Sequence, residues 1–317
     1  MGFNELNSVE HYIIHQLSGL NLNTKEVQEP SSSYGVKWVF NSSEELQRSV
    51  NEVLVESELK EALIRLNTDI AAKPELAGEV IYKLRAVLIA VNQVGLVKAN
   101  EEFFKWMTGE KTMPFGDNNR HVPIRLIDFE ELSNNTYIVT NQYRIHHRET
   151  KIPDVVMMIN GIPVVVGEAK TPIRPSVSWL DGAHEVHDIY ENAVPQLFVP
   201  NILSFATEGK ELYYGAIRCP LEFWAPWRLE NDDDAITKRL GLGEVGKELS
   251  DLLNPARLLD IMRNFSLFST DKKKRRIKII PRFQQYEGAN KIVERVKEGR
   301  VKKGLIWHFQ GSVKMLM

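Results

Sequence analysis

The sequence has almost no cysteine, no long apolar run and little net charge, and each shortage argues against a class of protein. Its 317 residues include one cysteine, Cys219, which excludes a disulfide framework and fits a reducing cytoplasm. No apolar run is long enough to cross a bilayer and the N-terminus resembles no secretory signal, so a cytoplasmic location without membrane contact is expected. The formal net charge of −2 does not by itself indicate nucleic-acid binding.

What the sequence does contain is typical of a soluble globular protein with unevenly distributed charge. Hydrophobic residues make up 43% of the chain and charged residues 26%. The length allows one large domain or two to three ordinary ones. Between Lys272 and Lys303 there are thirteen Lys or Arg residues and three Glu. Such a cluster can contact phosphates, or it can be a solvated helix face or linker.

Hydrophobic periodicity and turn residues predict mixed α/β structure. Helical spacing predicts a first helix over residues 4–20, with Glu10 in its first turn. Apolar and polar residues that alternate in patches, at 124–127 and 137–139 for example, predict strands between residues 121 and 147. Further helical segments are predicted at 46–66, 76–97, 100–108, 177–198 (mixed) and 252–268, a hairpin at 202–205 and 212–217, a basic linker at 272–276, and a new domain from about residue 277.

The stretch from Pro153 to Lys170 carries the strongest chemical signal. Two apolar runs, 155–159 and 162–166, flank the turn dipeptide Asn160-Gly161, and this pattern predicts a β-hairpin. Asp154 precedes the first run, and Gly167-Glu168-Ala169-Lys170 follows the second. Because side chains alternate along a strand, Glu168 and Lys170 share one face of the sheet.

The length of the turn decides whether Asp154 joins that face. A strict two-residue turn would pair Asp154 with Gly167 and would put Asp154 and Glu168 on opposite faces. An odd-length loop, such as a type I turn followed by a bulge, puts both on one face. Pro163 has no N–H and fits a bulged or interrupted ladder. We therefore expect a three-residue loop such as Ile159-Asn160-Gly161.

Two carboxylates beside a lysine suit the hydrolysis of a phosphodiester. Carboxylates can hold Mg²⁺, which prefers oxygen ligands, lowers the pKa of a bound water and polarises the phosphate. A neighbouring lysine can orient the water or stabilise developing negative charge. The alternative is a buried strand pair whose terminal charges are merely solvated, and the motif alone leaves both interpretations open.

Several stretches in this order resemble the N-terminal part of the R (restriction and motor) subunit of type I restriction enzymes, and the similarity covers essentially the whole chain. The spacing of the acids and the lysine is that of PD-(D/E)xK divalent-metal nucleases. The stretches are 3–10 (FNELNSVE), 140–143 (TNQY), 153–156 (PDVV), 160–163 (NGIP), 167–170 (GEAK), 195–198 (PQLF), 281–286 (PRFQQY) and 307–312 (WHFQGS).

The resemblance implies roles for individual residues. Asp154 and Glu168 match the metal-binding acids, and Lys170 matches the catalytic lysine. Glu10 matches an acid on the first helix near the metal, although an acid there is also favourable at a helix N-terminus. Tyr190 matches the tyrosine of a Gln-x-x-x-Tyr helix, although it could equally be a packing residue. The glutamine position is occupied by Val186, with Glu185 beside it, which puts the role of that helix in doubt.

The C-terminal end resembles the start of a superfamily 2 motor. Arg282, Gln284 and Gln285 resemble its adenine-reading segment, and Lys314 matches the lysine of its phosphate loop. Val313 replaces the glycine whose bare backbone reaches phosphate, and Met315 replaces the hydroxyl residue that would bind Mg²⁺. We expect a truncated or damaged ATPase remnant, in which Arg282, Gln285 and Lys314 form a degenerate ATP site that does not hydrolyse ATP.

The sequence therefore predicts an α/β fold of the PD-(D/E)xK type, a mixed sheet flanked by helices, followed by the beginning of a RecA-like motor domain. The predicted endonuclease domain covers residues 1–270 with a helical insertion at about 42–110, and residues 271–317 form the basic linker and motor start. The resemblance implies Mg²⁺-dependent cleavage of double-stranded DNA together with methylation and specificity subunits. The alternatives are a stand-alone nuclease and a non-catalytic DNA-binding or assembly module.

Overall fold

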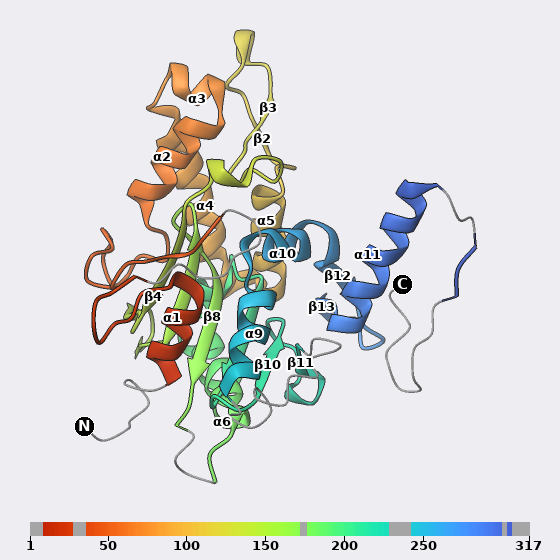
Figure 1. Cartoon of the computed structure of the whole chain (residues 1–317). Helices are drawn as coiled ribbons and strands as arrows, with labels where there is room; N and C mark the ends of the chain where they lie inside the picture. Colours follow the sequence, from red (N-terminus) through yellow and green to blue (C-terminus); the bar gives the residue numbers. More distant parts are fainter. Residues whose placement is uncertain (1–8, 28–35, 172–175, 228–241, 300–302, 306–317) are drawn as a thin grey trace.

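A seven-stranded mixed sheet lies at the centre of the computed structural model, which describes residues 9–27, 36–171, 176–227, 242–299 and 303–305 (Figure 1). Its strand order is β1-β4-β7-β8-β9-β10-β11. The pairs β1–β4 and β8–β9 are parallel, and the other neighbours are antiparallel. The strands are β1 (Val39–Phe40), β4 (Tyr137–Asn141), β7 (Val155–Ile159), β8 (Ile162–Ala169), β9 (Leu203–Thr207), β10 (Leu212–Gly215) and β11 (Ala225–Pro226).

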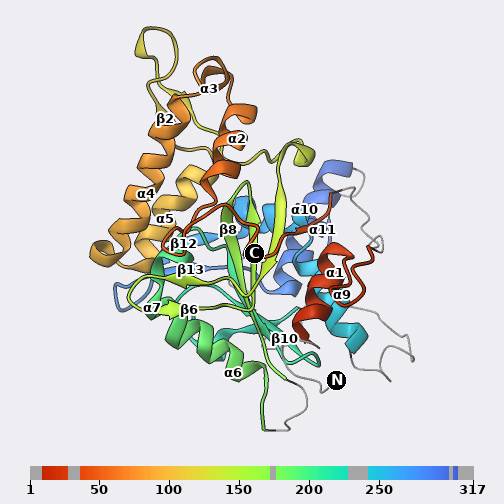
Figure 2. The same cartoon turned by 90° about the vertical axis from the view of Figure 1, so that its left-hand side faces the viewer.

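Helices cover both faces of this sheet. On one face, α1 packs on β4 and α9 packs on β10, and the two helices touch each other. On the other face, α6 packs on β8, β9 and β10, and α4 and α5 lie on the same side (Figure 2). The helices that surround the sheet are α1 (His11–Ser18), α4 (Leu76–Val94), α5 (Leu96–Met107), α6 (Trp179–His184), α7 (Glu191–Ala193), α9 (Leu242–Leu252) and α10 (Pro255–Asp260).

The central strands are apolar because they are covered on both sides. Every residue of β7 and β8 is buried, so the side chains on both faces of these strands are covered. This explains why the sequence shows two continuous apolar runs here rather than an alternation of apolar and polar residues. Within the described part of the chain, none of the helices has the length and apolar character needed to cross a membrane.

The predicted helical segment at 42–110 contains four helices: α2 (Glu56–Leu66), α3 (Thr68–Ala72), α4 and α5. The predicted helices at 76–97 and 100–108 are present as α4 and α5, but the break between them is at Gly95, which has a positive φ of 85°, and α5 begins at Leu96. The expected strand at 124–127 is absent from this described segment. The short ladders there and nearby are β2 (Thr112–Met113) with β3 (Val122–Pro123), and β5 (Ile145–His146) with β6 (Thr150–Lys151).

The C-terminal part differs from the prediction in its elements. The predicted helix at 252–268 begins where α9 ends and is occupied by α10, a π-helical turn (Ile261–Phe265) and the start of strand β12 (Leu267–Thr270). β12 pairs with β13 (Arg276–Ile279), so the predicted basic linker forms the turn of a hairpin. Helix α11 (Phe283–Glu298) follows, and it lies at the edge of the molecule farthest from the N-terminal side (Figure 1).

Candidate active site

The hairpin β7–β8 brings Asp154 and Glu168 opposite each other, by a route the sequence did not predict. Ile159 pairs with Ile162, so the turn has two residues, Asn160 and Gly161, with φ values of 51° and 74°. The expected three-residue loop is therefore wrong. The register shifts once between Met157 and Met158, because Val164 is bulged, and beyond the bulge Val155 pairs with Gly167. The next residues outward, Asp154 and Glu168, are therefore cross-strand neighbours.

Contacts at the end of β8 fix this arrangement. The Ala169 N–H donates to Asp154 Oδ2 at 2.9 Å. The Lys170 ammonium lies 2.8 Å from Glu168 Oε1, as expected for residues two apart on one strand. Helix α6 lies over this end of the strand, so Glu168 is only 3% exposed and Lys170 is mostly buried. The structure thus brings together the three residues that the motif predicted.

The environment of Glu168 opposes its negative charge. Burial, followed by the neighbouring Asp154 carboxylate, raises the pKa of Glu168 well above its ordinary value, although Lys170 acts in the opposite direction. Its second oxygen, Oε2, is buried and has no hydrogen-bond partner among the described residues. A divalent cation beside Asp154 and Glu168 would supply the missing partner and remove the repulsion, so these residues fit Mg²⁺. Within the described ranges, no group of three or more His, Cys, Asp or Glu side chains is arranged to hold a metal.

Glu10 reaches this site through amide side chains. It lies just before α1 and is 1% exposed. The Gln142 amide donates to Glu10 Oε2 at 2.8 Å and to Asp154 Oδ1 at 3.2 Å, so it bridges the two acids. Asn141 donates to the other oxygen of Glu10. Burial raises the pKa of Glu10 to about 7, although these amide hydrogen bonds oppose the shift.

A second carboxylate meets Lys170 from the helix that follows. α6 continues into a π-helical segment, η4 (Glu185–Tyr190). Glu185 Oε2 lies 2.6 Å from the Lys170 ammonium, and the Tyr190 hydroxyl donates to Glu185 Oε1 at 2.9 Å. Tyr190, which is 4% exposed, therefore reaches the predicted site through Glu185.

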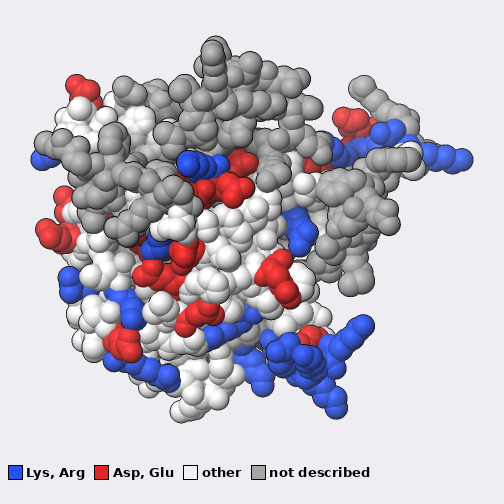
Figure 3. Space-filling view, turned by 90° about the horizontal axis from the view of Figure 1, so that it is seen from below, with Lys and Arg blue, Asp and Glu red and all other residues white. Residues whose placement is uncertain are grey.

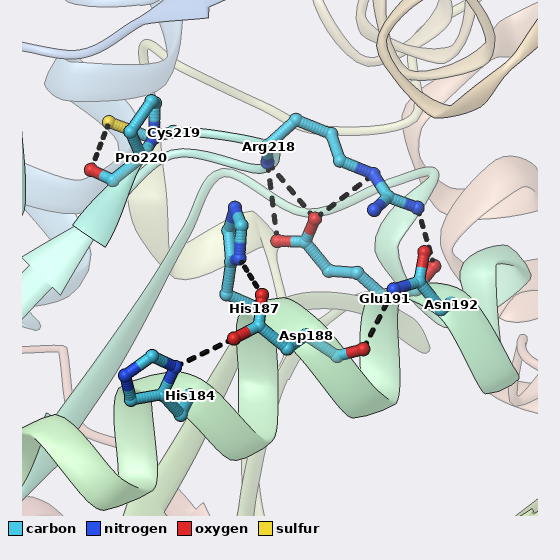
Figure 4. Close-up of polar contacts among 8 residues, drawn as sticks. All are labelled: His184, His187, Asp188, Glu191, Asn192, Arg218, Cys219 and Pro220. Carbon is cyan, nitrogen blue, oxygen red and sulfur yellow. Dashed lines mark hydrogen bonds and ion pairs between the residues drawn. The ribbon is translucent and has the colours of Figure 1, made fainter.

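The opposite side of the same helix is anchored by different groups (Figure 4). Asp188 accepts one hydrogen bond from His184 and one from His187 at the surface. Glu191 is fully buried, and the Arg218 backbone N–H donates to both of its oxygens at 3.0 and 3.3 Å. The contacts between Glu191 and Arg218 join the end of the helix to the chain that follows β10.

Sequence reasoning did not assign Glu185, Gln142 or Asn141 to the site. Asn141 and Gln142 lie in the 140–143 stretch that carries part of the family resemblance. Their place in that stretch is the sequence feature that could have assigned them to the site. Glu185 follows the five-residue spacing of a π-helix, and the pattern expected at that helix assumed α-helical spacing.

The predicted nucleotide-site residues are only partly described. Arg282 precedes α11, and its N–H donates to Gln285 Oε1 at 2.9 Å. Both residues border a cavity of about 420 Å³, which Tyr214, Cys219 and Lys278 also line. Lys314 and the neighbouring positions 311–315 lie outside the described residues.

Comparison with protein-family models and with known proteins shows similarity to subunits of type I restriction enzymes. The family model described as "Type I restriction enzyme R protein N terminus" matches residues 3–222, and a SWI2/SNF2 ATPase model matches residues 284–317. The HindI endonuclease subunit of a Haemophilus influenzae type I restriction enzyme is 29% identical over 274 residues, which cover 83% of this chain and 25% of that protein. A Methanocaldococcus jannaschii protein, named provisionally as the type I restriction enzyme MjaVIIIP endonuclease subunit, is 30% identical over 198 residues, 60% of this chain and 18% of that protein. The chain thus spans a quarter or less of the length of these two relatives.

Proposed function

The chain belongs to the family of type I restriction enzyme R protein N termini, and from that premise we propose that it carries a Mg²⁺-dependent endonuclease site for double-stranded DNA. The observation that carries this proposal is the bulged hairpin, which sets Asp154 opposite Glu168 with Lys170 beside them. The sheet and its helices are consistent with the PD-(D/E)xK type of fold. The ATPase match at residues 284–317 supports a RecA-like motor beginning near α11.

Asp154, Glu168 and Lys170 have different roles in the proposed reaction. Asp154 and Glu168 would hold Mg²⁺, and Oε2 of Glu168 is free to turn to it. When bound, the ion lowers the pKa of a water and neutralises charge on the phosphate. Lys170 keeps a positive charge because, although burial opposes it, Glu168 and Glu185 raise its pKa above the ordinary value. Its ammonium can therefore stabilise negative charge on the phosphate and orient the attacking water.

Cationic side chains on the surface support contact with DNA. Residues 272–275, three lysines and an arginine, are all exposed at the tip of the β12–β13 hairpin. Figure 3 shows Lys and Arg side chains gathered at one edge of the face seen from below. Such groups bind the phosphate backbone without reading sequence, so we assign sequence recognition to partner specificity and methylation subunits.

The motor part is proposed to be inactive in ATP hydrolysis. Val313 puts a branched side chain where a phosphate loop needs bare backbone, and Met315 offers no oxygen to Mg²⁺. DNA-stimulated release of phosphate by the purified chain would contradict this assignment.

Conversion of supercoiled plasmid to open circles by the purified chain tests the nuclease proposal. We expect nicking with Mg²⁺, none with EDTA, and a loss of about a hundredfold or more in Asp154→Ala and Lys170→Ala. Circular dichroism should show both variants folded. The assignment fails if either variant cuts like the wild type, and plasmid binding without any cutting would favour the non-catalytic alternative. Adding methylation and specificity subunits separates a stand-alone nuclease, which they would not affect, from a restriction subunit.

A further inference from the structure

Glu185 is an acid at the proposed site that the family pattern does not assign. The pattern expects a glutamine four residues before the tyrosine, and that position is Val186, which is completely buried. Glu185 lies five residues before Tyr190, yet the two side chains are hydrogen-bonded. A local change in the helix is needed to explain this contact.

The π-helical segment supplies that change. In an α-helix of 3.6 residues per turn, side chains five residues apart point about 140° away from each other. A π-helix bonds each residue to the fifth one along, so residues 185 and 190 come to the same side. The wider turn therefore presents Glu185 and Tyr190 together, toward the end of β8 that carries Lys170.

The hydrogen bonds of Glu185 distinguish its role from that of Glu168. Both oxygens of Glu185 are occupied, one by the Lys170 ammonium and the other by the Tyr190 hydroxyl. Glu168 instead keeps Oε2 without a hydrogen-bond partner among the described residues. Glu168 can therefore bind a cation through Oε2, whereas the two oxygens of Glu185 bind the side chains of Lys170 and Tyr190.

We propose that Glu185 is a positioning residue, which holds the Lys170 ammonium beside the Asp154–Glu168 pair and is itself fixed by Tyr190. A lysine on a flexible four-carbon stem has many rotamers, so one contact to Glu168 leaves the direction of its ammonium poorly defined. A second carboxylate at 2.6 Å, on a different element, fixes it at two points. The catalytic consequence of this positioning rests on the proposed nuclease function.

The electrostatic surroundings are consistent with this role. Burial opposes ionisation of Glu185, but the hydrogen bond and charge of Lys170, with the Tyr190 hydroxyl, hold the pKa of Glu185 below its ordinary value. Glu185 therefore stays a carboxylate at neutral pH and remains able to attract the lysine.

Cleavage kinetics give the first test. In Glu185→Ala we expect kcat to fall about 10- to 100-fold, with KM for DNA changed less than about threefold, as for other groups that orient a reacting side chain. Glu185→Gln should fall between this variant and the wild type, because its amide oxygen can still accept from Lys170. Glu191→Gln is the matched control: Glu191 lies on the same helical run but faces Arg218, so kcat should stay within about twofold of wild type.

The position of Lys170 can also be measured without cleavage. Reductive methylation of the intact protein, followed by peptide mass spectrometry, reports how freely each lysine reacts. We expect Lys170 to react about tenfold faster in Glu185→Ala than in the wild type or Glu191→Gln, because one of its two carboxylate partners is gone. Lysines far from the site, such as Lys60, serve as internal standards.

The two measurements separate the two proposals. If the wild type does not cut DNA, either alone or with methylation and specificity subunits, but Lys170 reacts faster in Glu185→Ala, the positioning role stands and the nuclease proposal fails. If the wild type cuts DNA but Glu185→Ala leaves kcat unchanged, or lowers it with Lys170 labelling unchanged, the positioning role is refuted. If there is neither cutting nor a change in labelling, both are refuted.

Discussion

At the scale of single residues, the site contains four carboxylates and one lysine. Glu168 and Glu185 both contact Lys170, Asp154 lies opposite Glu168, and Glu10 is linked to Asp154 through Gln142. Burial, and to a smaller extent the neighbouring Asp154 carboxylate, raises the pKa values of Glu168 and Glu10, because one ammonium does not neutralise the whole set. A site of this kind lowers the stability of the protein in the absence of a cation and gains stability when a cation binds.

Replacement of Glu168 by Gln tests that balance. Because the pKa of Glu168 is raised in the folded state, this residue costs stability above the ordinary pKa of a glutamate. We expect Glu168→Gln to be more stable than the wild type at pH 7.5 without metal, by about 1 kcal/mol or more. With Mg²⁺ at a hundred times its Kd, the wild type should gain about 2.7 kcal/mol and the variant much less.

Thermal unfolding with and without Mg²⁺ measures both effects. Ca²⁺ serves as a second hard cation, and Lys60→Gln serves as a control for a charge change far from the site. Equal Mg²⁺-induced shifts in the wild type and Glu168→Gln would contradict the metal assignment.

Glu191 gives a pH-dependent prediction away from the proposed metal site. Burial raises its pKa to about 8, even though Arg218 opposes the shift. Between an unfolded pKa near 4.5 and about 8, the folded state therefore binds more protons than the unfolded state, so stability falls as pH rises through this window. Relative to Glu191→Gln, the wild type should lose up to about 1.4 kcal/mol per pH unit between pH 5 and 8. Urea unfolding across this range checks it, and parallel stability curves for the two proteins would refute it.

The site was predictable where strand geometry alone decides it. Alternation along β8 fixes Glu168 and Lys170 on one face, whatever surrounds them. Gln142 could not be found in this way, because it follows β4 in a left-handed conformation, with φ of 49°, that no periodicity signals. Glu185 was missed because the expected helix was α-helical, whereas the segment Glu185–Tyr190 is π-helical.

At the scale of elements, the β7–β8 hairpin shows why turn residues alone did not determine the register. Asn160-Gly161 correctly signalled a hairpin, and both residues adopt the positive φ of a two-residue turn. The parity change comes instead from the bulge at Val164, next to Pro163, whose missing N–H suits an interrupted ladder. Pro163 indicated an irregular ladder, but nothing in the sequence distinguishes Val164 from the other valines of the run as the extra residue.

The tight turn itself gives a prediction about Gly161. Its φ is 74°, and a Cβ atom there would overlap the Val55 carbonyl oxygen and crowd Glu58 at the start of α2. Gly161→Ala should therefore combine backbone strain with a steric clash, and lower the free energy of unfolding by about 3 kcal/mol. Gly299→Ala is the control, because Gly299 has a similar φ of 64° and nothing within 4 Å of the added carbon.

We expect only about 1 kcal/mol of destabilisation from Gly299→Ala. Urea denaturation of both variants gives the comparison, and the difference between them isolates the clash. Equal losses would mean that the turn can move away from α2.

At the scale of the whole molecule, the region after residue 270 is packed onto the body that carries the site. Lys278 is 4% exposed, donates to the Asn201 carbonyl at 2.6 Å, and lies over the Phe104 ring. The Tyr214 hydroxyl donates to the Pro281 carbonyl at 2.6 Å. Phe283 and Tyr286 of α11 pack near Trp227. The sequence suggested a linker here because the charged residues 272–276 hide the strands on either side of them. The predicted domain boundary at 270/271 remains a prediction.

A shortened chain tests whether that boundary divides independent units. Ending the chain after Thr270 would remove β13 and α11, and would expose the rings of Phe104, Tyr214 and Trp227 that they cover. Losing several buried side chains, each worth about 1.5–3 kcal/mol, should lower the Tm clearly and increase binding of a hydrophobic dye. A chain ending at Gly299 keeps these contacts and should unfold, like the full chain, in one transition at nearly the same Tm. If the chain ending at Thr270 has the Tm of the full chain and binds no dye, residues 1–270 are an independent domain, and the contacts of Lys278 and α11 contribute little to its stability.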